Sequence, residues 1–508
     1  MVAKIFSFSL WGLEAYPIDI EIDISNGLPA LTIVGLADTA VKESKERVKS
    51  AIKNSGFNWP AERITISLAP SDIKKEGTGF DLAIALGILS ASEQLNSVNL
   101  ESFCVLGELS LDGSIRPTKG ILPISISLAK TKIKNLILPC WNAKEAAVIS
   151  DINAYPLRTL RETVEFLSNP ETIQPLKVDI KDLFQIQARY QEDFSEVKGQ
   201  YFAKRALEVA VAGGHNILFI GPPGSGKTML AQRIPTIIPD LTLPEALEIT
   251  KIHSIAGILP IKDGIITRRP FRLPHHTISG AALVGGGSTP QAGEISLAHQ
   301  GVLFLDELPE FNRNCLESLR QPLEDGTISI SRVNRSFVFP ASFMLACAMN
   351  PCPCGYYTDP HKTCKCNSIK IDHYMGKISG PLLDRIDIHI EIPAIHYKEL
   401  TDPQEAEPSA VIKARVEKAR VIQRERLRHD RIFHNARMST RLIKKYCTLE
   451  DEAKEILRLA MTELGLSARA YDKVIRVSRT IADLAGSDII RAGHIAEAVQ
   501  YRSLDRKL

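Results

Sequence analysis

The chain has 508 residues, an apolar fraction of 44% and a formal charge of +3. This length predicts roughly three or four domains, and such an apolar fraction can fill sizeable hydrophobic cores. The small charge excludes a polycation, and the lack of a long apolar stretch argues against a membrane-spanning protein. We expect a cytoplasmic protein, because residues 4–13 lack a cleavage site for export and predict a strand instead.

Residues 1–168 carry the alternating and helical patterns of an α/β domain. Isoleucines alternate with polar residues over 17–25, and residues 63–68 repeat this pattern of a half-buried strand. Helices are predicted over 39–54 and 80–92, between and after these strands. Strands and helices that interleave in this way predict one mixed domain.

Three further segments follow. A linker is predicted over 169–195, and residues 196–395 alternate strands and helices around a glycine-rich loop, which predicts a mostly parallel sheet. Residues 396–508 predict a basic helical segment followed by a helical bundle over 450–502, and between 413 and 445 twelve residues are basic against three acidic ones. The basic residues are Lys413, Arg415, Lys418, Arg420, Arg424, Arg426, Arg428, Arg431, Arg437, Arg441, Lys444 and Lys445.

The sequence GPPGSGKT at 221–228 fits the phosphate-loop pattern G-x-x-x-x-G-K-[ST]. It follows an apolar run that predicts a strand, and it precedes residues that can open a helix. Such a loop presents backbone N–H groups to phosphates, so we expect Lys227 to reach the β/γ-phosphates and Thr228 to ligate Mg²⁺. A glycine-rich turn without function is the alternative. The predicted nucleotide-binding residues are Gly221, Pro222, Pro223, Gly224, Ser225, Gly226, Lys227, Thr228 and Met229.

Two other apolar strands end in polar side chains that suit the same chemistry. Residues 301–305 lead into Asp306, expected to hold Mg²⁺, and Glu307, expected to orient or deprotonate the attacking water. Residues 343–349 lead into Asn350, which can hydrogen-bond the water or the γ-phosphate. A solvated turn at the two acids and a capping role for the asparagine are the alternatives.

Two arginines are candidates for contacting the γ-phosphate. Arg385 lies between two acids in Leu382–Asp387, where an intrachain salt bridge is the competing explanation. Arg469 lies in Ser467–Ala470 at the start of a predicted helix, and it could simply lie in solvent. The sequence leaves both alternatives open for each arginine.

Four cysteines lie within fifteen residues, directly after the asparagine strand. Four thiolates suit a tetrahedral Zn²⁺ ion, and free thiols or an iron–sulfur cluster are the alternatives. His361 and His373 are spare ligands that fit surface positions better. A metal-bound loop here would brace Asn350 rather than take part in chemistry. The predicted ligands are Cys352, Cys354, Cys364 and Cys366.

Residues 327–339 predict a β-hairpin with a basic tip. Arg332, Asn334 and Arg335 could hold DNA phosphates, which need positive charge and hydrogen-bond donors. Charge runs are more often solvated faces, so an exposed hairpin without a ligand is the alternative.

The order of these motifs resembles an AAA+ ATPase. The flanking phrases VKGQYFAKRALEVAVAGGHNILFIG, FRLPHHTISGAALVGGG and GPLLDRIDIHIEIP narrow the resemblance to the magnesium-chelatase-like branch and, within it, to the ComM/YifB family. The resemblance covers nearly the whole chain. It implies an α/β fold with a Lon-protease-like N-terminal domain (of the ribosomal S5 domain 2-like type), a central AAA+ domain and a C-terminal helical lid.

The resemblance also implies a role for each candidate residue. Lys227 and Thr228 would form Walker A, and Asp306 and Glu307 would form Walker B. Asn350 would be sensor 1. Arg385 would be the arginine finger, which contacts the ATP of a neighbouring subunit, and Arg469 would be sensor 2. Gly199 and Gln200 would lie near the adenine.

The N-terminal domain resembles the Lon protease domain without its catalytic pair. Gly79 stands where the serine nucleophile belongs, and Leu122 stands where the lysine base belongs. Ser71 and Lys119 are close in sequence but off register. Nucleophilic catalysis needs both groups within hydrogen-bond reach, so the domain is expected to be catalytically dead and to serve as a collar.

In function, the resemblance implies a homo-hexameric, ATP-dependent DNA motor or helicase for branch migration of recombination intermediates in natural transformation. Its partners would be single-stranded or branched DNA and recombination proteins. A metal-insertion motor of the magnesium-chelatase type is the alternative, and residues 1–168 argue against it because that subunit lacks a Lon-like domain. A protein remodeller is a further alternative, although the hairpin tip is basic rather than aromatic.

Overall fold

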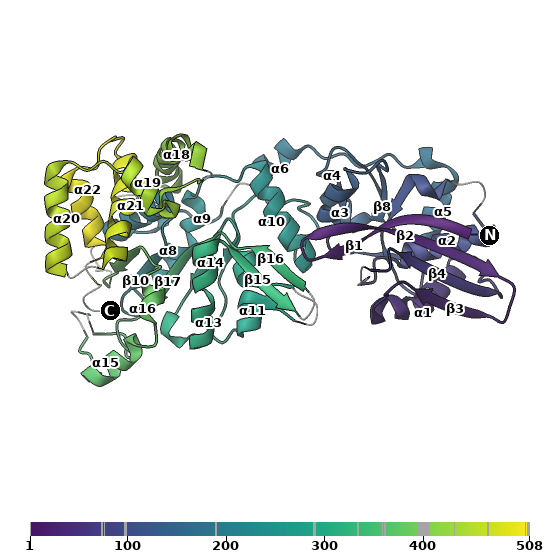
Figure 1. The fold of residues 1–508 in the computed structure, drawn as a ribbon, viewed down its shortest axis with the longest axis horizontal. Coiled ribbons are helices and arrows are strands. Elements are labelled where there is room, and N and C mark those ends of the chain that lie inside the picture. Colours follow the sequence, from purple (N-terminus) through teal and green to yellow (C-terminus); the bar gives the residue numbers. More distant parts are fainter. Residues whose placement is uncertain are drawn as a thin grey trace. The chain divides into compact units, whose positions relative to one another are not determined.

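The computed structural model describes residues 2–72, 75, 77–95, 99–187, 190–287, 291–332, 335–357, 359, 362–394, 406–430, 432–464, 467–502 and 504. The chain divides into two compact units, whose elements are labelled in Figure 1. The first contains Met1–Gln187 and Thr242–Thr267, and the second contains Ala188–Leu241 and Arg268–Leu508. Within the described part of the chain, a membrane-spanning helix is absent.

The first unit contains a mixed sheet of seven strands in the order β3-β4-β2-β1-β5-β8-β9. β1 and β2 are antiparallel, and Ile18, Ile20 and Ile22 of β2 are fully buried, as expected for a strand with one face in the core. The strands predicted over 4–13, 17–25 and 63–68 are thereby confirmed. The strands are β1 (Val2–Trp11), β2 (Glu14–Ser25), β3 (Ala30–Val34), β4 (Arg63–Ala69), β5 (Phe103–Val105), β8 (Asn135–Pro139) and β9 (Asn153–Leu157).

The helices of the first unit include the two that the sequence predicts over 39–54 and 80–92. The first begins where the Asp38 carboxylate accepts a hydrogen bond from the N–H of Val41, an ordinary N-cap. The second is buried along nearly its whole length. The helices are α1 (Thr39–Asn54), α2 (Asp81–Ala91), α3 (Ile121–Leu128), α4 (Ala143–Ala147), α5 (Leu160–Ser168), α6 (Ile180–Gln187) and α10 (Leu243–Ala256).

One of these helices, α10, comes from a distant part of the sequence. Its Ser254 hydroxyl donates to the buried carboxylate of Glu145, and its Ser254 carbonyl accepts from the N–H of Gly120 at 3.2 Å. These contacts tie α10 to the residues around α3 and α4, so residues 242–267 fold with the first unit. The ranges predicted from sequence, which counted this segment within 196–395, omit that excursion.

The second unit contains a five-stranded sheet in the order β11-β14-β17-β10-β18, with every pair parallel. This confirms the predicted parallel sheet. Because the strands are parallel, all their carboxyl ends meet at one edge, where ligands bind in open α/β sheets. The strands are β10 (Ile217–Ile220), β11 (Phe271–Arg272), β14 (Val302–Leu305), β17 (Met344–Met349) and β18 (Ile388–Glu391).

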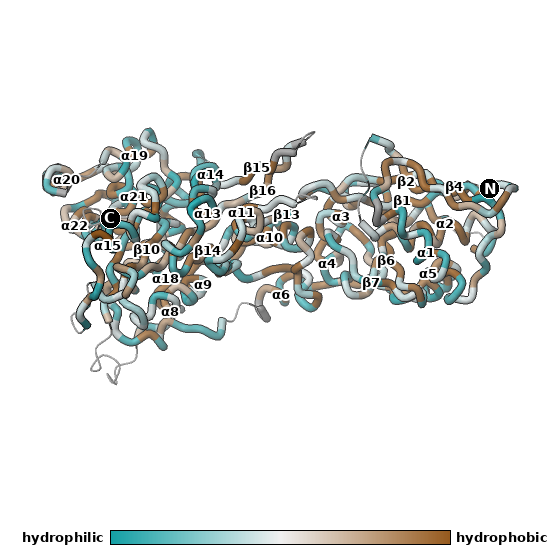
Figure 2. Tube along the Cα trace, turned by 90° about the horizontal axis from the view of Figure 1, so that it is seen from below, coloured by the Kyte–Doolittle hydropathy of each residue, from teal (hydrophilic) through white to brown (hydrophobic). Residues whose placement is uncertain are grey.

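Helices surround this sheet, and the C-terminal ones gather as the yellow-green part of Figure 1. Most elements in Figure 2 change between brown and teal along their length, the pattern of elements with one buried face. The chain is therefore a mixed α/β protein with a helical C-terminal part. The helices used below are α7 (Tyr201–Gly213), α8 (Lys227–Gln232), α14 (Arg320–Asp325), α15 (Ser368–Met375), α18 (Ser409–Leu427), α20 (Asp451–Leu464), α21 (Ala468–Leu484) and α22 (Ala492–Gln500).

Candidate nucleotide-binding site

The glycine-rich loop connects β10 to α8 at the carboxyl edge of the sheet. Gly226 precedes α8 with φ at 86°, a left-handed conformation that favours glycine. A Cβ on Gly221 would lie 2.2 Å from the carbonyl oxygen of Ile392, so only glycine fits there. The motif glycines are thus required by the backbone of the turn itself, as the phosphate-loop interpretation predicts.

Lys227 points back into this loop. Its ammonium donates to the carbonyl oxygens of Gly221 and Pro222, both at 2.8 Å, and to Oδ1 of Asn350 at 3.3 Å. Burial lowers the pKa of Lys227, and the nearby Asp306 carboxylate opposes that shift. A cation is therefore held among backbone oxygens and one amide, from which it can turn to phosphate oxygens.

Thr228 and Asp306 meet beside the loop. The Thr228 hydroxyl donates to Oδ2 of Asp306 at 2.7 Å, and Oδ1 of the same carboxylate accepts from the N–H of Glu307 at 2.9 Å. One hydroxyl and one carboxylate are the hard oxygen ligands that Mg²⁺ prefers. The donor chemistry of this pair fits the predicted ion, and α8 and the end of β14 bring the two residues together.

Glu307 has a partner that the sequence does not reveal. Nδ1 of His276 lies 3.2 Å from Oε2 of Glu307, and the His275 ring lies against His276 with centroids 4.2 Å apart. Glu307 itself has φ at 53°, unusual for a residue other than glycine. Nothing local in the sequence joins residues 276 and 307, so sequence patterns do not predict this contact.

Two residues before α7 also reach the loop. The Gln200 amide donates to the carbonyl oxygens of Ser225 at 3.4 Å and Pro393 at 3.2 Å. Gly199 and Gln200 have φ at 61° and 54°, so both turn sharply just before the helix. The predicted adenine segment and the phosphate loop therefore adjoin, and Met229 packs against the core below them.

Arg385 and Arg469 lie away from the phosphate loop of their own chain. The Arg385 guanidinium forms an ion pair with Glu324, and Nη1 of Arg469 lies 3.5 Å from Oδ2 of Asp384. Both arginines line a pocket of about 380 Å³, and its lining residues include none of the phosphate loop. The intrachain salt bridge foreseen as the alternative for Arg385 is thus present.

This pocket lies at the amino edge of the sheet. The Asn216 amide, just before β10, donates to the carbonyl oxygen of Arg385 at 2.8 Å, whereas the phosphate loop follows the same strand. Strands rise about 3.3 Å per residue, so four residues separate the two edges by about 13 Å. The structure does not bring these arginines to the phosphate loop of their own chain.

A buried charge network connects this pocket to the C-terminal helices. Asp387 lies 3.4 Å from Nδ1 of His215 and 3.5 Å from Nζ of Lys473, which belongs to α21. Burial raises the pKa of Asp387, but the two neighbours outweigh it and hold that pKa below its ordinary value. Burial lowers the pKa of Lys473 to about 8, against the pull of Asp387. The network fixes α21, and with it Arg469, to the sheet.

The predicted DNA contacts are only partly described. β15 (Thr327–Arg332) and β16 (Arg335–Pro340) form the predicted hairpin, with Arg332 paired to Arg335 at its end. Asn334 and the side chains of both arginines lie outside the described residues. The hairpin is confirmed, while its phosphate contacts stay a prediction.

Part of the basic run over 413–445 is paired with acidic residues of the same chain. Lys413 pairs with Asp240 at 2.6 Å, Arg415 pairs with Glu208 and Glu407, and Arg426 pairs with Asp483. These three residues support helix packing, whereas other basic residues of the run are exposed: Lys418, Arg424, Arg428, Arg441, Lys444 and Lys445.

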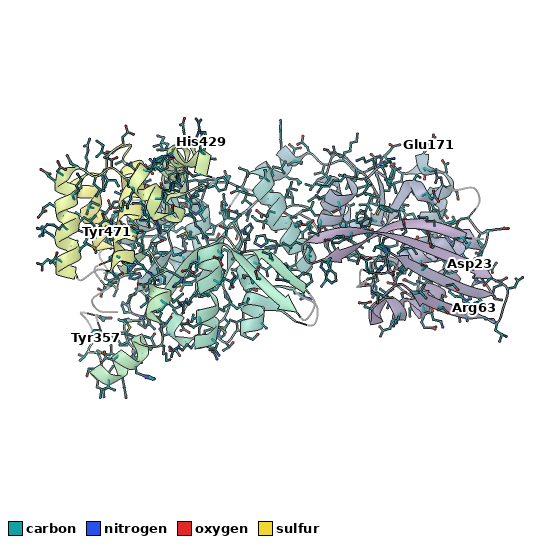
Figure 3. The ribbon with its side chains drawn as sticks, viewed as in Figure 1. Asp23, Arg63, Glu171, Tyr357, His429 and Tyr471 are labelled. Carbon is teal, nitrogen blue, oxygen red and sulfur yellow. The ribbon has the colours of Figure 1, made fainter. Side chains whose placement is uncertain are left out.

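The four clustered cysteines come together. Their ligand atoms all lie within 4.8 Å of one another, so this cluster of Cys352, Cys354, Cys364 and Cys366 can hold a metal ion. Tyr357, which belongs to the same loop, is labelled in Figure 3. His373 is exposed on α15, and His361 lies outside the described residues.

The residues compared with the Lon catalytic pair are Gly79 and Leu122, which offer neither a nucleophile nor a base. A Cβ on Gly79 would lie 3.8 Å from a methyl group of Thr118, so the two segments adjoin. Leu122 is fully buried in α3, where its N–H donates to the Glu145 carboxylate at 2.8 Å. Ser71 and Lys119 are both exposed.

Comparison with known proteins places the chain in one family. Three family descriptions match it: magnesium chelatase, subunit ChlI, over residues 193–400; subunit ChlI of Mg-chelatase over 20–142; and the ChlI C-terminal part over 406–502. Competence protein ComM of Haemophilus influenzae is 44% identical over 100% of this chain and 98% of its own length. YifB of Escherichia coli is 43% identical over 98% and 96%.

A more distant relative matches a much smaller share of this chain. The magnesium-chelatase 67 kDa subunit of Chlorobaculum parvum is 28% identical over 31% of this chain and 23% of its own length. The full-length matches and the order of the motifs point to the same family. The chain belongs to the ComM/YifB family of magnesium-chelatase-like proteins.

Proposed function

We propose that the chain is an ATPase. The observation that carries the proposal is the joining of Lys227, Asn350, Thr228 and Asp306 at one point of the sheet edge by hydrogen bonds of 2.7 to 3.3 Å. Lys227 would contact the β/γ-phosphates, and Thr228 and Asp306 would hold the Mg²⁺ that neutralises them. Glu307 would orient the attacking water.

The second part of the proposal is that the chain works as a ring, which we take to be a homo-hexamer. Arg385 and Arg469 line one pocket at the amino edge, so any ATP that they contact belongs to a neighbouring copy. An arginine supplied by a neighbour is a familiar device for stabilising charge on a transferring phosphoryl group. Each active site would then need two subunits.

The third part is that ATP hydrolysis moves DNA, in branch migration during natural transformation. The Haemophilus influenzae relative is named a competence protein and matches the whole length of this chain, and this name favours the role. The β15–β16 hairpin would hold the DNA through Arg332, Asn334 and Arg335. Recombination proteins would be its partners, and ATP and Mg²⁺ its cofactors, with Zn²⁺ assigned to the cysteine cluster.

A metal-insertion motor is the second candidate, because the matching families are described by a magnesium-chelatase subunit. We favour the DNA motor, since the chelatase 67 kDa subunit matches less than a third of this chain while the competence protein matches all of it. The two candidates differ in what stimulates hydrolysis, a four-way DNA junction or a porphyrin-binding partner.

DNA is expected to raise ATP turnover, and ATP is expected to drive strand displacement on forked or four-way DNA. Phosphate release, measured with and without such DNA at increasing salt, checks this. Binding to backbone phosphates releases counterions, so raising salt from 50 to 200 mM should weaken affinity by about a thousandfold or more if six or more phosphates are contacted. Salt-independent binding, or no response to any DNA, would contradict the proposal.

Removing both hairpin arginines, Arg332→Ala with Arg335→Ala, should uncouple hydrolysis from DNA movement. Strand displacement and the DNA-driven rise in turnover should be lost, while nucleotide affinity stays as in the unchanged protein. Arg458→Ala is the matched control, since Arg458 is an exposed arginine of α20 outside the predicted DNA-binding residues. Normal displacement by the double variant would show that the DNA contacts lie elsewhere.

A further inference from the structure

The loop that carries the cysteine cluster has little regular structure of its own. Among the described residues between Cys352 and Asn367, none belongs to a helix or a strand. Only Cys352 of the four cysteines is buried, and the other three are half-buried. A segment with so few packed apolar side chains gains little order from burial. Something other than a hydrophobic core has to hold it.

The four sulfur atoms lie close enough together to bind one metal ion, all within 4.8 Å of one another. Sγ of Cys352 lies 3.3 Å from that of Cys354 and 3.6 Å from that of Cys364, and the last two are 3.5 Å apart. A tetrahedron with Zn–S bonds of about 2.3 Å has sulfur–sulfur edges of about 3.8 Å. All nine cysteines of the chain are free thiols, so the cluster is not occupied by disulfides.

The same loop lies directly on the nucleotide site. Gly355, one residue past Cys354, is buried with φ at 86°, and its N–H donates to the carbonyl oxygen of Cys352 at 2.9 Å. A Cβ on Gly355 would lie 2.5 Å from Cδ of Pro223 and 3.9 Å from Cγ of Asn350. One residue of the cysteine loop therefore touches both the phosphate loop and the amide that faces Lys227.

We propose that the four cysteines bind one Zn²⁺ and that the ion-bound loop positions Pro223 and Asn350 for ATP hydrolysis. The inference about Zn²⁺ stands on the sulfur geometry alone, whereas its consequence for ATP rests on the proposed function. Thiolate binding supplies the free energy that orders the loop, because metal binding to an otherwise unstructured segment is folding free energy. The ion is structural, since four protein ligands leave no position for a substrate.

Two measurements on the full-length protein test the metal. Elemental analysis should find zinc near one per chain, and replacement by Co²⁺ should give the visible absorption of a tetrahedral thiolate site. Cys364→Ser with Cys366→Ser should remove both signals, while Cys140→Ser, a half-buried thiol outside the cluster, should keep them. Iron with cluster absorption, or a chain that neither contains zinc nor takes up Co²⁺, would overturn the assignment.

Gly355→Ala tests the positioning role without touching a ligand. It should keep full zinc content, yet the added methyl group overlaps the Pro223 ring, and displacement of a reacting centre by about 1 Å costs about a hundredfold in kcat/KM. Gly486→Ala is the matched control, because Gly486 has a similar φ of 66° but no atom within 4 Å of a built Cβ. It carries the same backbone strain without the clash.

The outcomes separate this inference from the proposed function. If the unchanged protein binds no ATP, the proposed function fails, while the zinc content still decides the metal site. If the unchanged protein hydrolyses ATP and Gly355→Ala does so at the same kcat/KM with zinc retained, the positioning role is wrong. A loss in Gly486→Ala equal to that in Gly355→Ala would also overturn it.

Discussion

Lys227→Ala should lower the rate of ATP hydrolysis by at least about a hundredfold, the usual cost of removing one charged donor from a reacting centre. The Lys227 ammonium lies 2.8 Å from two loop oxygens and 3.3 Å from Oδ1 of Asn350, so the variant removes the cation that lies between these groups. Phosphate release measures the loss, and strand exchange should fall with it because the motor would have no energy source.

A buried lysine can also matter for folding alone, so the variant needs a matched control. Lys204 in α7 is 8% exposed, as is Lys227, and its ammonium also donates to backbone carbonyl oxygens, those of Phe194 and Val197. Lys204→Ala should lower the melting temperature but keep the rate of hydrolysis in the folded protein. Equal rates for the two variants, or unimpaired turnover by Lys227→Ala, would contradict the assigned role.

Much of the candidate site could be predicted because its residues follow strands. Asp306 and Asn350 each come directly after an apolar run, and the phosphate loop follows another. Once the sheet is known to be parallel, these strand ends must lie at one edge. Local sequence patterns therefore sufficed to bring together residues more than a hundred positions apart.

The contacts that could not be predicted join residues far apart in the sequence, and no local sequence pattern marks them. His276 reaches Glu307, and Glu324 pairs with Arg385, through side chains whose positions depend on the packing of whole segments. The excursion of 242–267 into the first unit likewise rests on a few hydrogen bonds to Glu145 and Gly120. Hydrophobic periodicity carries information about burial, not about which distant segment supplies the partner.

The basic run over 413–445 also shows that local patterns do not reveal which distant residues pair with one another. Such a charge density is typical of a DNA-binding surface, but Arg415 and Arg426 form ion pairs with Glu208, Glu407 and Asp483. These guanidinium groups hold helices together, and binding DNA phosphates would break their ion pairs. Counting basic residues along a sequence overstates a nucleic-acid surface wherever the acids that neutralise them are distant in the chain.

Arg385→Ala should be inactive alone, with a loss of about a thousandfold or more in turnover, the range for a finger arginine. Yet mixing it with the equally inactive Lys227→Ala protein should restore hydrolysis. In a ring, an Arg385→Ala subunit still supplies a complete phosphate loop, and its Lys227→Ala neighbour still supplies the arginine. Random equal mixing should make about one quarter of the sites complete. Phosphate release from the mixture, compared with each variant alone, measures the recovery.

The control for this mixing is a chain that carries both changes. Combined with Lys227→Ala protein it should restore nothing, because no subunit then has an intact phosphate loop. If the two single variants form mixed assemblies but recover no activity, then Arg385 does not act across an interface. Yet the Arg385 pocket lies at the amino ends of strands whose carboxyl ends carry the phosphate loop, and the two edges are about 13 Å apart. A side chain held by Glu324 on the far edge can serve ATP only if that ATP is bound by another copy.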